Sequence, residues 1–344
     1  MGTPKITYIL LFFLLFTISV FSQDKTFTNP ILPSGADPYS TYYNGYYYYT
    51  NTLQNRLVLW KTKNLAALDK AESVTVWTPP EGRDYSKDIW APEVHFINNN
   101  WYIYFAADDG DNKTHRMYAL QNTSKDPFKG KWEFKGKIAA KTDKWAIDGN
   151  VFFHKGQLYM IWSGWEGDAN GQQDIYIAKM KNPLEIDGDR VRISSPTFDW
   201  EKHGDLDDPD LPHVNVNEGP QFLEHKGRIF IVFSASGCWT DNYSLGLLSF
   251  NGSDDLLDAS LWTKSEEPIF TQAPQNGVYA PGHNSFFKSP DGKQDWILYH
   301  ANSKPGQGCG RFRSPRMQRL YWDTSGMPYL GPPLPENVIL EIPS

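Results

Sequence analysis

Short runs of aromatic and β-branched residues recur along the chain, each after a polar turn. Five copies are found, at residues 45–49, 100–105, 156–162, 227–233 and 294–299. A polar loop and a second apolar run follow each copy, at residues 56–60, 116–120, 174–178, 243–247 and 316–320. The order strand, turn, strand, loop, strand therefore recurs with a spacing of roughly 55 to 70 residues, with no convincing amphipathic helix between the strands.

A repeat of this size, built from short strands, predicts an all-β protein with the architecture of a five-bladed β-propeller, in which each blade is a small antiparallel sheet. A β-sandwich also has evenly spaced short strands, but its strands do not repeat their whole sequence pattern. No linker rich in proline, serine or glycine divides the 344 residues. We therefore expect a single propeller domain over residues 23–344.

Three carboxylates share one register relative to these repeats. Asp37 and Asp148 each lie eight residues ahead of the glycine that opens the following strand, and Glu218 lies nine residues ahead. The same register gives Glu93 in the second repeat and His283 in the fifth. The first strand of each propeller blade lines the central channel, so equivalent positions point at a common axis. An acid before proline or glycine is usually a turn residue, but the shared register predicts one site with three acids.

The N-terminus has the pattern of a secretory signal peptide over residues 1–22. Lys5 supplies the charged end, residues 8–16 the apolar stretch, and Ser22 the small residue before the expected cleavage point. A membrane anchor is the alternative, but the apolar run is short and no later segment approaches the roughly 20 residues that a membrane span needs. We therefore expect an exported protein, periplasmic or extracellular, with no membrane span in the mature chain.

Charge and motif content narrow the chemistry. The net charge of −7 argues against nucleic acid or another anionic polymer as the partner and favours a neutral substrate. The sequence contains no CxxC, HExxH or GxSxG motif and no glycine-rich phosphate loop, so zinc, serine-nucleophile and nucleotide chemistry lack support. Its two cysteines, Cys238 and Cys309, fit either one disulfide or two buried thiols. Carboxylate chemistry is what the sequence favours.

Five short segments, in this order and spacing, resemble glycoside hydrolase family 43, the five-bladed propeller enzymes that act on plant polysaccharides containing arabinose and xylose. The resemblance spans nearly all of the mature chain. The segments are Asn29-Pro30-Ile31-Leu32 leading into Ala36-Asp37-Pro38, Asp88-Ile89-Trp90-Ala91-Pro92-Glu93-Val94, Ile147-Asp148-Gly149, Asn217-Glu218-Gly219-Pro220, and Tyr279-Ala280-Pro281-Gly282-His283-Asn284.

The resemblance implies a role for each acid. Asp37 is similar to the general base, Glu218 to the general acid, and Asp148 to a third carboxylate that orients the acid and keeps its pKa high. An inverting glycosidase needs this division, because one carboxylic acid protonates the leaving oxygen while a carboxylate on the opposite face activates water. A neighbouring anion favours the protonated form of the acid by repulsion of like charges. Glu93 is not one of this trio, and we expect a structural role for it.

Other residues are assigned to the site by the same resemblance. Trp90 is expected to stack on a sugar ring, with plain core packing as the alternative. His283 is similar to the histidine near a central calcium or sodium ion, which would be structural, so that no cofactor is required; an ordinary hydrogen-bonding histidine is the alternative. Arg316 is expected to point at substrate hydroxyls and the acids, with Arg311 and Arg313 as close competitors.

Residues 233–240 and 243–246 look most like exo-acting α-L-arabinofuranosidases. This implies a monomeric enzyme that releases L-arabinofuranose from arabinan or from arabinose-decorated plant cell-wall carbohydrate. A β-xylosidase, an endo-arabinanase and a non-catalytic sugar-binding propeller are the alternatives. The intact acid trio argues against the last of these. The acidic insert at residues 205–213 precedes the acid strand, so it is expected to be a solvated loop that narrows one mouth of the channel and favours a terminal sugar.

Overall fold

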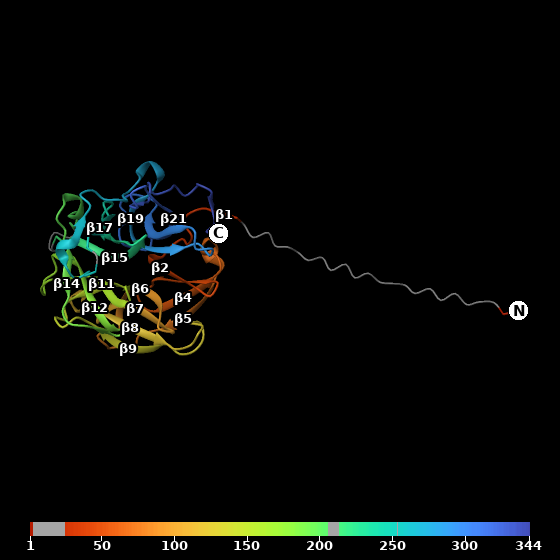
Figure 1. Ribbon diagram of the computed structural model, residues 1–344, viewed down its shortest axis with the longest axis horizontal. Coiled ribbons are helices and arrows are strands. Elements are labelled where there is room, and N and C mark those ends of the chain that lie inside the picture. The colour runs from red at the N-terminus through yellow and green to blue at the C-terminus, as the bar shows by residue number, and fades with distance from the viewer. Residues whose placement is uncertain (3–24, 206–212, 253) are drawn as a thin grey trace.

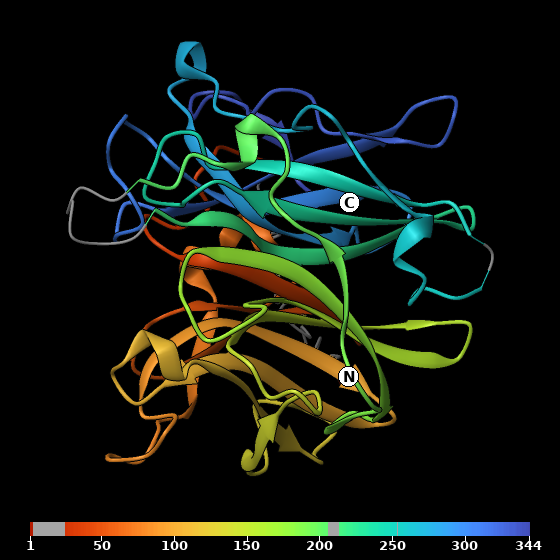
Figure 2. The ribbon, with the colours of Figure 1, turned by 90° about the vertical axis from the view of Figure 1, so that its left-hand side faces the viewer.

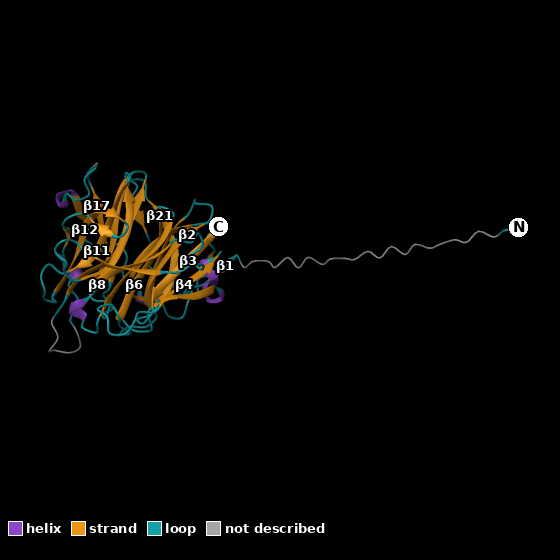
Figure 3. Ribbon diagram, turned by 90° about the horizontal axis from the view of Figure 1, so that it is seen from below, coloured by secondary structure: helices purple, strands orange, loops and turns teal. Residues whose placement is uncertain are grey.

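The structure is a computed structural model that describes residues 1–2, 25–205, 213–252 and 254–344. Most of the predicted signal peptide, residues 1–22, and most of the acidic insert, residues 205–213, lie outside the described residues. The described chain is built almost entirely from β-strands, with only short 3₁₀ turns at the periphery (Figure 3). The prediction of an all-β protein is therefore confirmed. None of the helices in the described ranges is long and apolar enough to cross a membrane.

Antiparallel sheets follow one another along the chain (Figure 1). The first contains β2 (Ala36–Tyr43), β3 (Tyr46–Thr52), β4 (Leu57–Thr62) and β5 (Glu72–Trp77). The second contains β6 (Lys87–Ile97), β7 (Asn100–Asp108), β8 (Arg116–Asn122) and β9 (Glu133–Ile138). The last contains β19 (Tyr279–Lys288), β20 (Asp295–Asn302), β21 (Ser314–Trp322) and β22 (Pro328–Tyr329). The short 3₁₀ turns are η1 (Leu65–Lys70), η2 (Asn112–Thr114), η3 (Asp199–Glu201), η4 (Ala259–Leu261) and η5 (Pro274–Asn276).

Two antiparallel units lie between these sheets. One contains β10 (Ala146–His154), β11 (Gln157–Gly164) and β12 (Gln172–Asn182), with β13 (Glu185–Ile186) and β14 (Val191–Ser194) both paired to β12. The other contains β15 (Asn215–His225), β16 (Arg228–Ala235), β17 (Ser244–Phe250) and β18 (Trp262–Lys264). The two units touch through a short parallel pairing of Gln172 and Gln173 in β12 with Asn215 and Val216 in β15.

The first strands of successive units contact one another and lie near the middle of the body. The strand β2 contacts β6, β6 contacts β10, β10 contacts β15, β15 contacts β19, and β19 contacts β2. Figure 1 shows β2, β6 and β15 centrally and β5, β9 and β14 towards the outside. Figure 2 shows the sheets from the side, with the early ones below and the later ones above.

Buried apolar side chains fill the space between neighbouring units. One cluster joins Trp101 of β7 to Tyr48 of β3, and another joins Trp296 of β20 to Tyr47 of β3, so the last sheet packs against the first. Large aromatic rings supply much of this buried area, which is the main source of folding free energy. Trp101, Trp162 and Trp296 each lie in one of the aromatic repeats, and all three belong to the core, since each is at most 3% exposed.

Each central strand contains a β-bulge at the same place. The ladder with the second strand of the unit skips between Ala36 and Tyr39, Trp90 and Glu93, Ile147 and Asn150, Glu218 and Gln221, and Gly282 and Ser285. A residue with positive φ lies in each skip: Asp37 (57°), Ala91 (43°), Asp148 (59°), Gly219 (53°) and His283 (45°). Bulges of this kind redirect side chains and are common beside active sites. Spacing predicts Glu93 as the counterpart in β6, but the register places Ala91 there, so that prediction is wrong. In β15 the register places Gly219 there, one residue after Glu218.

Candidate active site

A cavity of about 350 Å³ opens where the central strands begin. It is lined by all three predicted acids, which come from the starts of β2, β10 and β15. The five bulges explain this convergence, because each turns the start of its strand at a similar depth in the ring. The structure thus brings together Asp37, Asp148 and Glu218, and it places Trp90 and His283 in the same lining.

Asp37 is held as a carboxylate by its neighbours. The Thr52 hydroxyl donates to its Oδ2 at 2.6 Å, and the Arg313 guanidinium lies 3.2 Å from its Oδ1. His283 Nδ1 lies 3.3 Å from the same Oδ1, and His300 Nδ1 accepts the backbone N–H of Asp37 at 3.1 Å. Burial by itself raises the pKa of Asp37, but His283, Arg313, His300 and the Thr52 hydroxyl outweigh it and hold the pKa below its ordinary value.

Glu218 has the opposite environment. It is buried, and its Oε1 accepts a hydrogen bond from the Tyr243 hydroxyl at 2.8 Å. Burial raises the pKa of Glu218 to about 7, since the charge of Asp37 adds to it while the Tyr243 hydroxyl and Arg313 only partly oppose it. The Glu218 side chain is therefore able to carry a proton near neutral pH.

The pKa of Asp148 is displaced upwards, in the same direction as that of Glu218. Its Oδ2 accepts the backbone N–H of Gly219 at 2.9 Å, directly after Glu218 in the sequence. Burial raises the pKa of Asp148 well above its ordinary value, and the charges of Glu218 and Asp37 raise it further. The sequence predicts that the charge of Asp148 keeps the pKa of Glu218 high. In the structure, burial makes the largest contribution to the raised pKa of both groups.

The structure corrects the predicted arginine. Arg316, in β21, is fully buried away from the cavity and donates to Ser303 Oγ and to the Glu336 carboxylate at 2.7 Å. Arg313 instead contacts Asp37 and lines the cavity. The reason is that Arg313 ends the loop before β21, whereas Arg316 lies inside the strand, where its side chain faces the neighbouring chain segment.

Tyr243, His300 and Thr52 are further site residues that the sequence reasoning missed. Tyr243 lies at the end of the loop before β17, and its ring lies parallel to that of His300 with centroids 5.7 Å apart. The sequence signal for Tyr243 was the segment 243–246, which resembles exo-acting α-L-arabinofuranosidases. Neither His300 nor Thr52 shares the register of the acids, because both lie on the second strands of their units.

Trp90 contributes to the wall of the cavity and is partly exposed. Its indole N–H donates to Gln54 Oε1 at 2.9 Å, and its ring stacks on His115 with centroids 4.1 Å apart. Trp145 and Trp239 line the cavity from other units. An exposed indole face fixed from behind can stack on the apolar face of a sugar ring.

Glu93 lies in a hydrogen-bond network between strands, in line with the structural role expected for it. Its carboxylate binds His95 Nε2 and Asn150 Nδ2, each at 2.8 Å, and also the Gln221 side chain. These groups cross-link three central strands below the acids. Among the described residues, no group of three or more His, Cys, Asp or Glu side chains could hold a metal ion, so the ion predicted beside His283 finds no such donor set.

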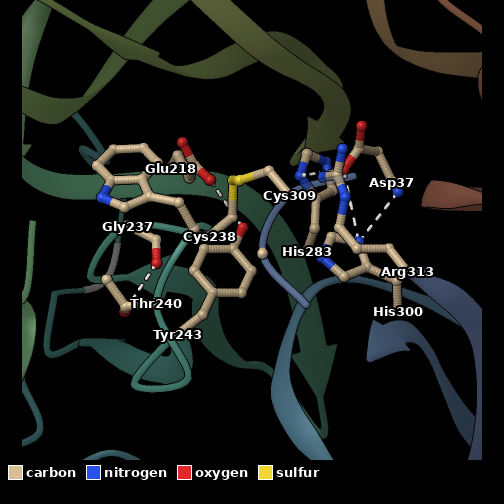
Figure 4. Close-up of a disulfide and its surroundings, with 12 residues drawn as sticks. Asp37, Glu218, Gly237, Cys238, Thr240, Tyr243, His283, His300, Cys309 and Arg313 are labelled. Carbon is tan, nitrogen blue, oxygen red and sulfur yellow. Dashed lines mark hydrogen bonds and ion pairs between the residues drawn. A yellow bond between two sulfur atoms is a disulfide. The ribbon is translucent and has the colours of Figure 1, made fainter. Parts of the chain in front are cut away.

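Cys238 and Cys309 form a disulfide, which resolves the alternatives left open by the sequence. Their Cα atoms are 5.3 Å apart, within the ordinary range for such a bond. Both cysteines line the cavity. Figure 4 shows the bond between a group containing Glu218 and Tyr243 and a group containing Asp37, His283, His300 and Arg313.

Comparisons with known proteins decide the family. Residues 27–328 match the model of the glycosyl hydrolases family 43. The chain belongs to glycosyl hydrolase family 43. The resemblance stated from its motifs is thereby confirmed. This family 43 chain is also 38% identical over 326 residues to an extracellular exo-α-(1→5)-L-arabinofuranosidase of Streptomyces avermitilis, covering 92% of this chain and 66% of that protein.

Two further relatives are informative. A protein of Streptomyces chartreusis with the same description is 35% identical, over 80% of this family 43 chain and 82% of that protein. The crystal structure of an α-L-arabinofuranosidase from Lactobacillus brevis superposes with a TM-score of 0.83 at 34% identity, covering 91% of this chain and 98% of that one. The chain thus spans nearly all of the solved structure, but only about two thirds of the Streptomyces avermitilis relative.

Proposed function

We propose that the protein is an inverting glycoside hydrolase that releases L-arabinofuranose from arabinan or arabinose-decorated plant polysaccharides and oligosaccharides. The observation that carries this proposal is the opposite displacement of two carboxyl pKa values in one cavity, lowered at Asp37 and raised to about 7 at Glu218. Two carboxyl groups whose environments separate their pKa values are the arrangement that acid and base catalysis of glycoside cleavage needs. The arabinofuranosidase relatives support the choice of sugar.

The residues divide the reaction as follows. The Glu218 carboxylic acid gives its proton to the glycosidic oxygen while the bond from that oxygen to the anomeric carbon breaks. The Asp37 carboxylate takes a proton from the water that attacks the anomeric carbon from the opposite face. Asp148 holds the Gly219 N–H and so fixes the backbone beside the acid. Trp90 forms a stacking wall for the sugar, and Arg313 takes the place that was predicted for Arg316.

The proposal also covers the propeller architecture and the export of the protein. Five antiparallel units whose central strands contact one another in a ring support a five-bladed β-propeller over residues 23–344. A cleaved signal peptide at residues 1–22 and release to the periplasm or the medium accord with the extracellular relatives. A monomeric state and an ion beside His283 stay predictions, and no step of the mechanism passes through that ion.

The test is hydrolysis of aryl α-L-arabinofuranoside and aryl β-D-xyloside, with proton NMR of the first product. We expect preferential cleavage of the arabinoside with inversion at the anomeric carbon. Glu218→Gln should lower kcat/KM for an arabinose disaccharide by about 10²- to 10⁴-fold, and much less for a dinitrophenyl arabinoside, whose leaving group needs little protonation. Asp37→Asn should lower both alike, because both reactions need the activated water.

Each other outcome has a definite meaning. Preference for the xyloside would make the protein a β-xylosidase, and mixed oligosaccharides from arabinan would make it an endo-acting enzyme. Binding of arabinose without cleavage would make it a sugar-binding propeller. Equal turnover of Glu218→Gln and the unmodified chain on the disaccharide would contradict the assignment of the acid.

A further inference from the structure

Two loops at one side of the cavity are joined covalently. The loop of residues 236–243 connects β16 to β17, and the loop of residues 303–313 connects β20 to β21. Cys238 in the first loop and Cys309 in the second form the disulfide, and the backbone N–H of Gly306 also donates to the Asp241 carboxylate at 2.9 Å. Both cysteines are partly exposed where they line the cavity, so a small reductant can reach the bond.

Each of these loops ends in a residue that contacts one of the two proposed catalytic acids. Tyr243 ends the first loop and donates its hydroxyl to Glu218 Oε1 at 2.8 Å. Arg313 ends the second loop and places Nη1 3.2 Å from Asp37 Oδ1. Figure 4 shows the disulfide between these two pairs. The bond is therefore the covalent link between the segment that supports the acid and the segment that supports the base.

The two supports do not depend on the disulfide equally. Tyr243 is fully buried and is packed against His300, so contacts of its own hold it in place. The loop of Arg313 is largely exposed over residues 304–306 and 310–312. The Arg313 carbonyl accepts the Gly35 N–H at 2.9 Å, which anchors the backbone at the loop end, and the side chain is held there by its contact with Asp37. Loss of the disulfide should therefore loosen Arg313 more than Tyr243.

We propose that the Cys238–Cys309 disulfide is a positioning element of the active site, which holds Arg313 against Asp37 so that the base stays aligned with the acid. This inference rests on the proposed function. It makes the activity sensitive to reduction. A phosphine reductant supplies the two electrons that break the bond, and water supplies the oxygen of the phosphine oxide and the two protons that complete the thiols.

The experiment compares kcat, KM and the pH profile of arabinofuranoside hydrolysis before and after reduction of the folded protein with a phosphine. The chain has only two cysteines, so titration of free thiols reports this bond alone. We expect kcat/KM to fall by about ten- to a hundredfold, because small misplacements of catalytic groups cost rates of this order. The acidic limb of the profile should move to higher pH, since a weaker Arg313 contact lets the pKa of Asp37 rise.

The matched control is the double variant Cys238→Ser with Cys309→Ser. It should behave like the reduced protein and should not respond to the phosphine. If this variant does not fold, the comparison of reduced and oxidised protein still decides, with circular dichroism to show that the reduced chain stays folded. A disulfide that only stabilises the fold would lower Tm while leaving kcat, KM and the pH profile unchanged, and that result overturns the proposal.

A readout that needs no substrate separates this inference from the proposed function. Carboxyl carbon NMR of aspartate-labelled protein follows the titration of Asp37 in the oxidised and reduced states. A higher pKa of Asp37 after reduction supports the positioning role even if no arabinofuranoside is cleaved, in which case only the proposed function fails. An unchanged pKa together with unchanged kinetics contradicts the positioning role itself.

Discussion

Three carboxyl groups in one cavity have different protonation tendencies because each has different neighbours. A guanidinium, two imidazoles and a hydroxyl surround Asp37, so its charged form is favoured despite burial. At Glu218 a single hydroxyl and the arginine only partly oppose the cost of burial. Burial raises the pKa of Asp148, and the charges of Glu218 and Asp37 raise it further. The same chemical group, a carboxyl, can thus serve as base or acid according to what the fold places within a few ångströms of it.

This contrast predicts the pH dependence of the reaction. Glu218 must be protonated to act, so activity should fall as the pH rises through about 7, the raised pKa of Glu218. Asp37 must be ionised, so activity should persist to a pH below the ordinary pKa of an aspartate. Asp148→Asn should move the basic limb to lower pH, since the charge of Glu218 raises the pKa of Asp148 and such repulsion between two carboxylates is reciprocal.

The measurement is kcat/KM for an aryl arabinofuranoside over a pH series, with and without Asp148→Asn. Asparagine keeps an oxygen that can accept the Gly219 N–H, so the variant removes the charge with little change in the hydrogen bond. A basic limb that stays at the same pH in the variant would show that Asp148 does not contribute to the raised pKa of Glu218.

Individual residues show where sequence reasoning reached its limit. The shared register found Asp37, Asp148 and Glu218, because all three lie on the first strand of a repeat. It could not choose Arg313 over Arg316, because a shift of three residues decides whether a side chain lies in a loop or inside a strand. It also missed Tyr243, whose contact with Glu218 joins a loop to a strand of the same unit.

Among the elements, the strands were predictable and the bulges were not. All five aromatic repeats coincide with strands, from β3 to β20, and the second apolar runs coincide with the strands that follow. Alternation and aromatic content are properties of a single segment, so the sequence carries them directly. A bulge depends on pairing between two strands, which a single segment does not show. The counterpart in β6 is therefore Ala91, two residues before the predicted Glu93.

The bulge at Glu218 gives a prediction on Gly219. Gly219 has φ of 53°, and a Cβ added there would lie 3.3 Å from the His283 ring and from Ser234 Oγ. Gly219→Ala should lower kcat, because the methyl group crowds His283 and disturbs the N–H that Asp148 accepts. The backbone strain of an alanine at positive φ costs about 1 to 2 kcal/mol of stability in addition.

Gly227→Ala is the matched control for this variant. Gly227 has φ of 78°, and an added Cβ meets no atom within 4 Å, so the strain is comparable while the crowding is absent. Urea denaturation should show a loss of stability in both variants, and enzyme kinetics should show a lower kcat only for Gly219→Ala. Equal kcat values in the two variants would mean that the Gly219 bulge does not position the site.

At the scale of the whole molecule, the N-terminal segment joins the last sheet to the first. The strand β1 (Thr26–Phe27) pairs with β23 (Leu340–Glu341), so the segment that precedes the first sheet is held to the one that follows the last. Residues 29–35 then run alongside the start of β21. The N–H groups of Ile31 and Gly35 donate to the carbonyls of Pro315 and Arg313, each at 2.9 Å. The chain next enters β2 in the first sheet. The same segment therefore binds the last sheet and leads into the first, and it fixes Asp37 and Arg313 relative to one another.

Asn29 makes two of the hydrogen bonds that hold this segment to the last sheet. Its side chain is 3% exposed, and it both accepts the N–H of Met317 and donates to the carbonyl of Met317, at 2.9 Å in each case. The strand β22 covers β21 only at Tyr321 and Trp322, so Asn29 supplies the partner that the edge of β21 lacks at Met317. Asn29→Ala leaves a buried donor and a buried acceptor without partners, which should cost about 2 to 5 kcal/mol of stability.

Urea denaturation of Asn29→Ala, beside Asn100→Ala, tests how much the bonds between Asn29 and Met317 stabilise the fold. Asn100 also bonds a backbone carbonyl through its side chain, that of Asn98, but it does so in an exposed turn, where water replaces the lost bond. The control should therefore change stability by less than about 0.5 kcal/mol. If the N-terminal segment positions Asp37 and Arg313, Asn29→Ala should also lower kcat under conditions where the variant is fully folded. A large loss of stability with an unchanged kcat would show instead that the central strands hold the acids in place without the N-terminal segment.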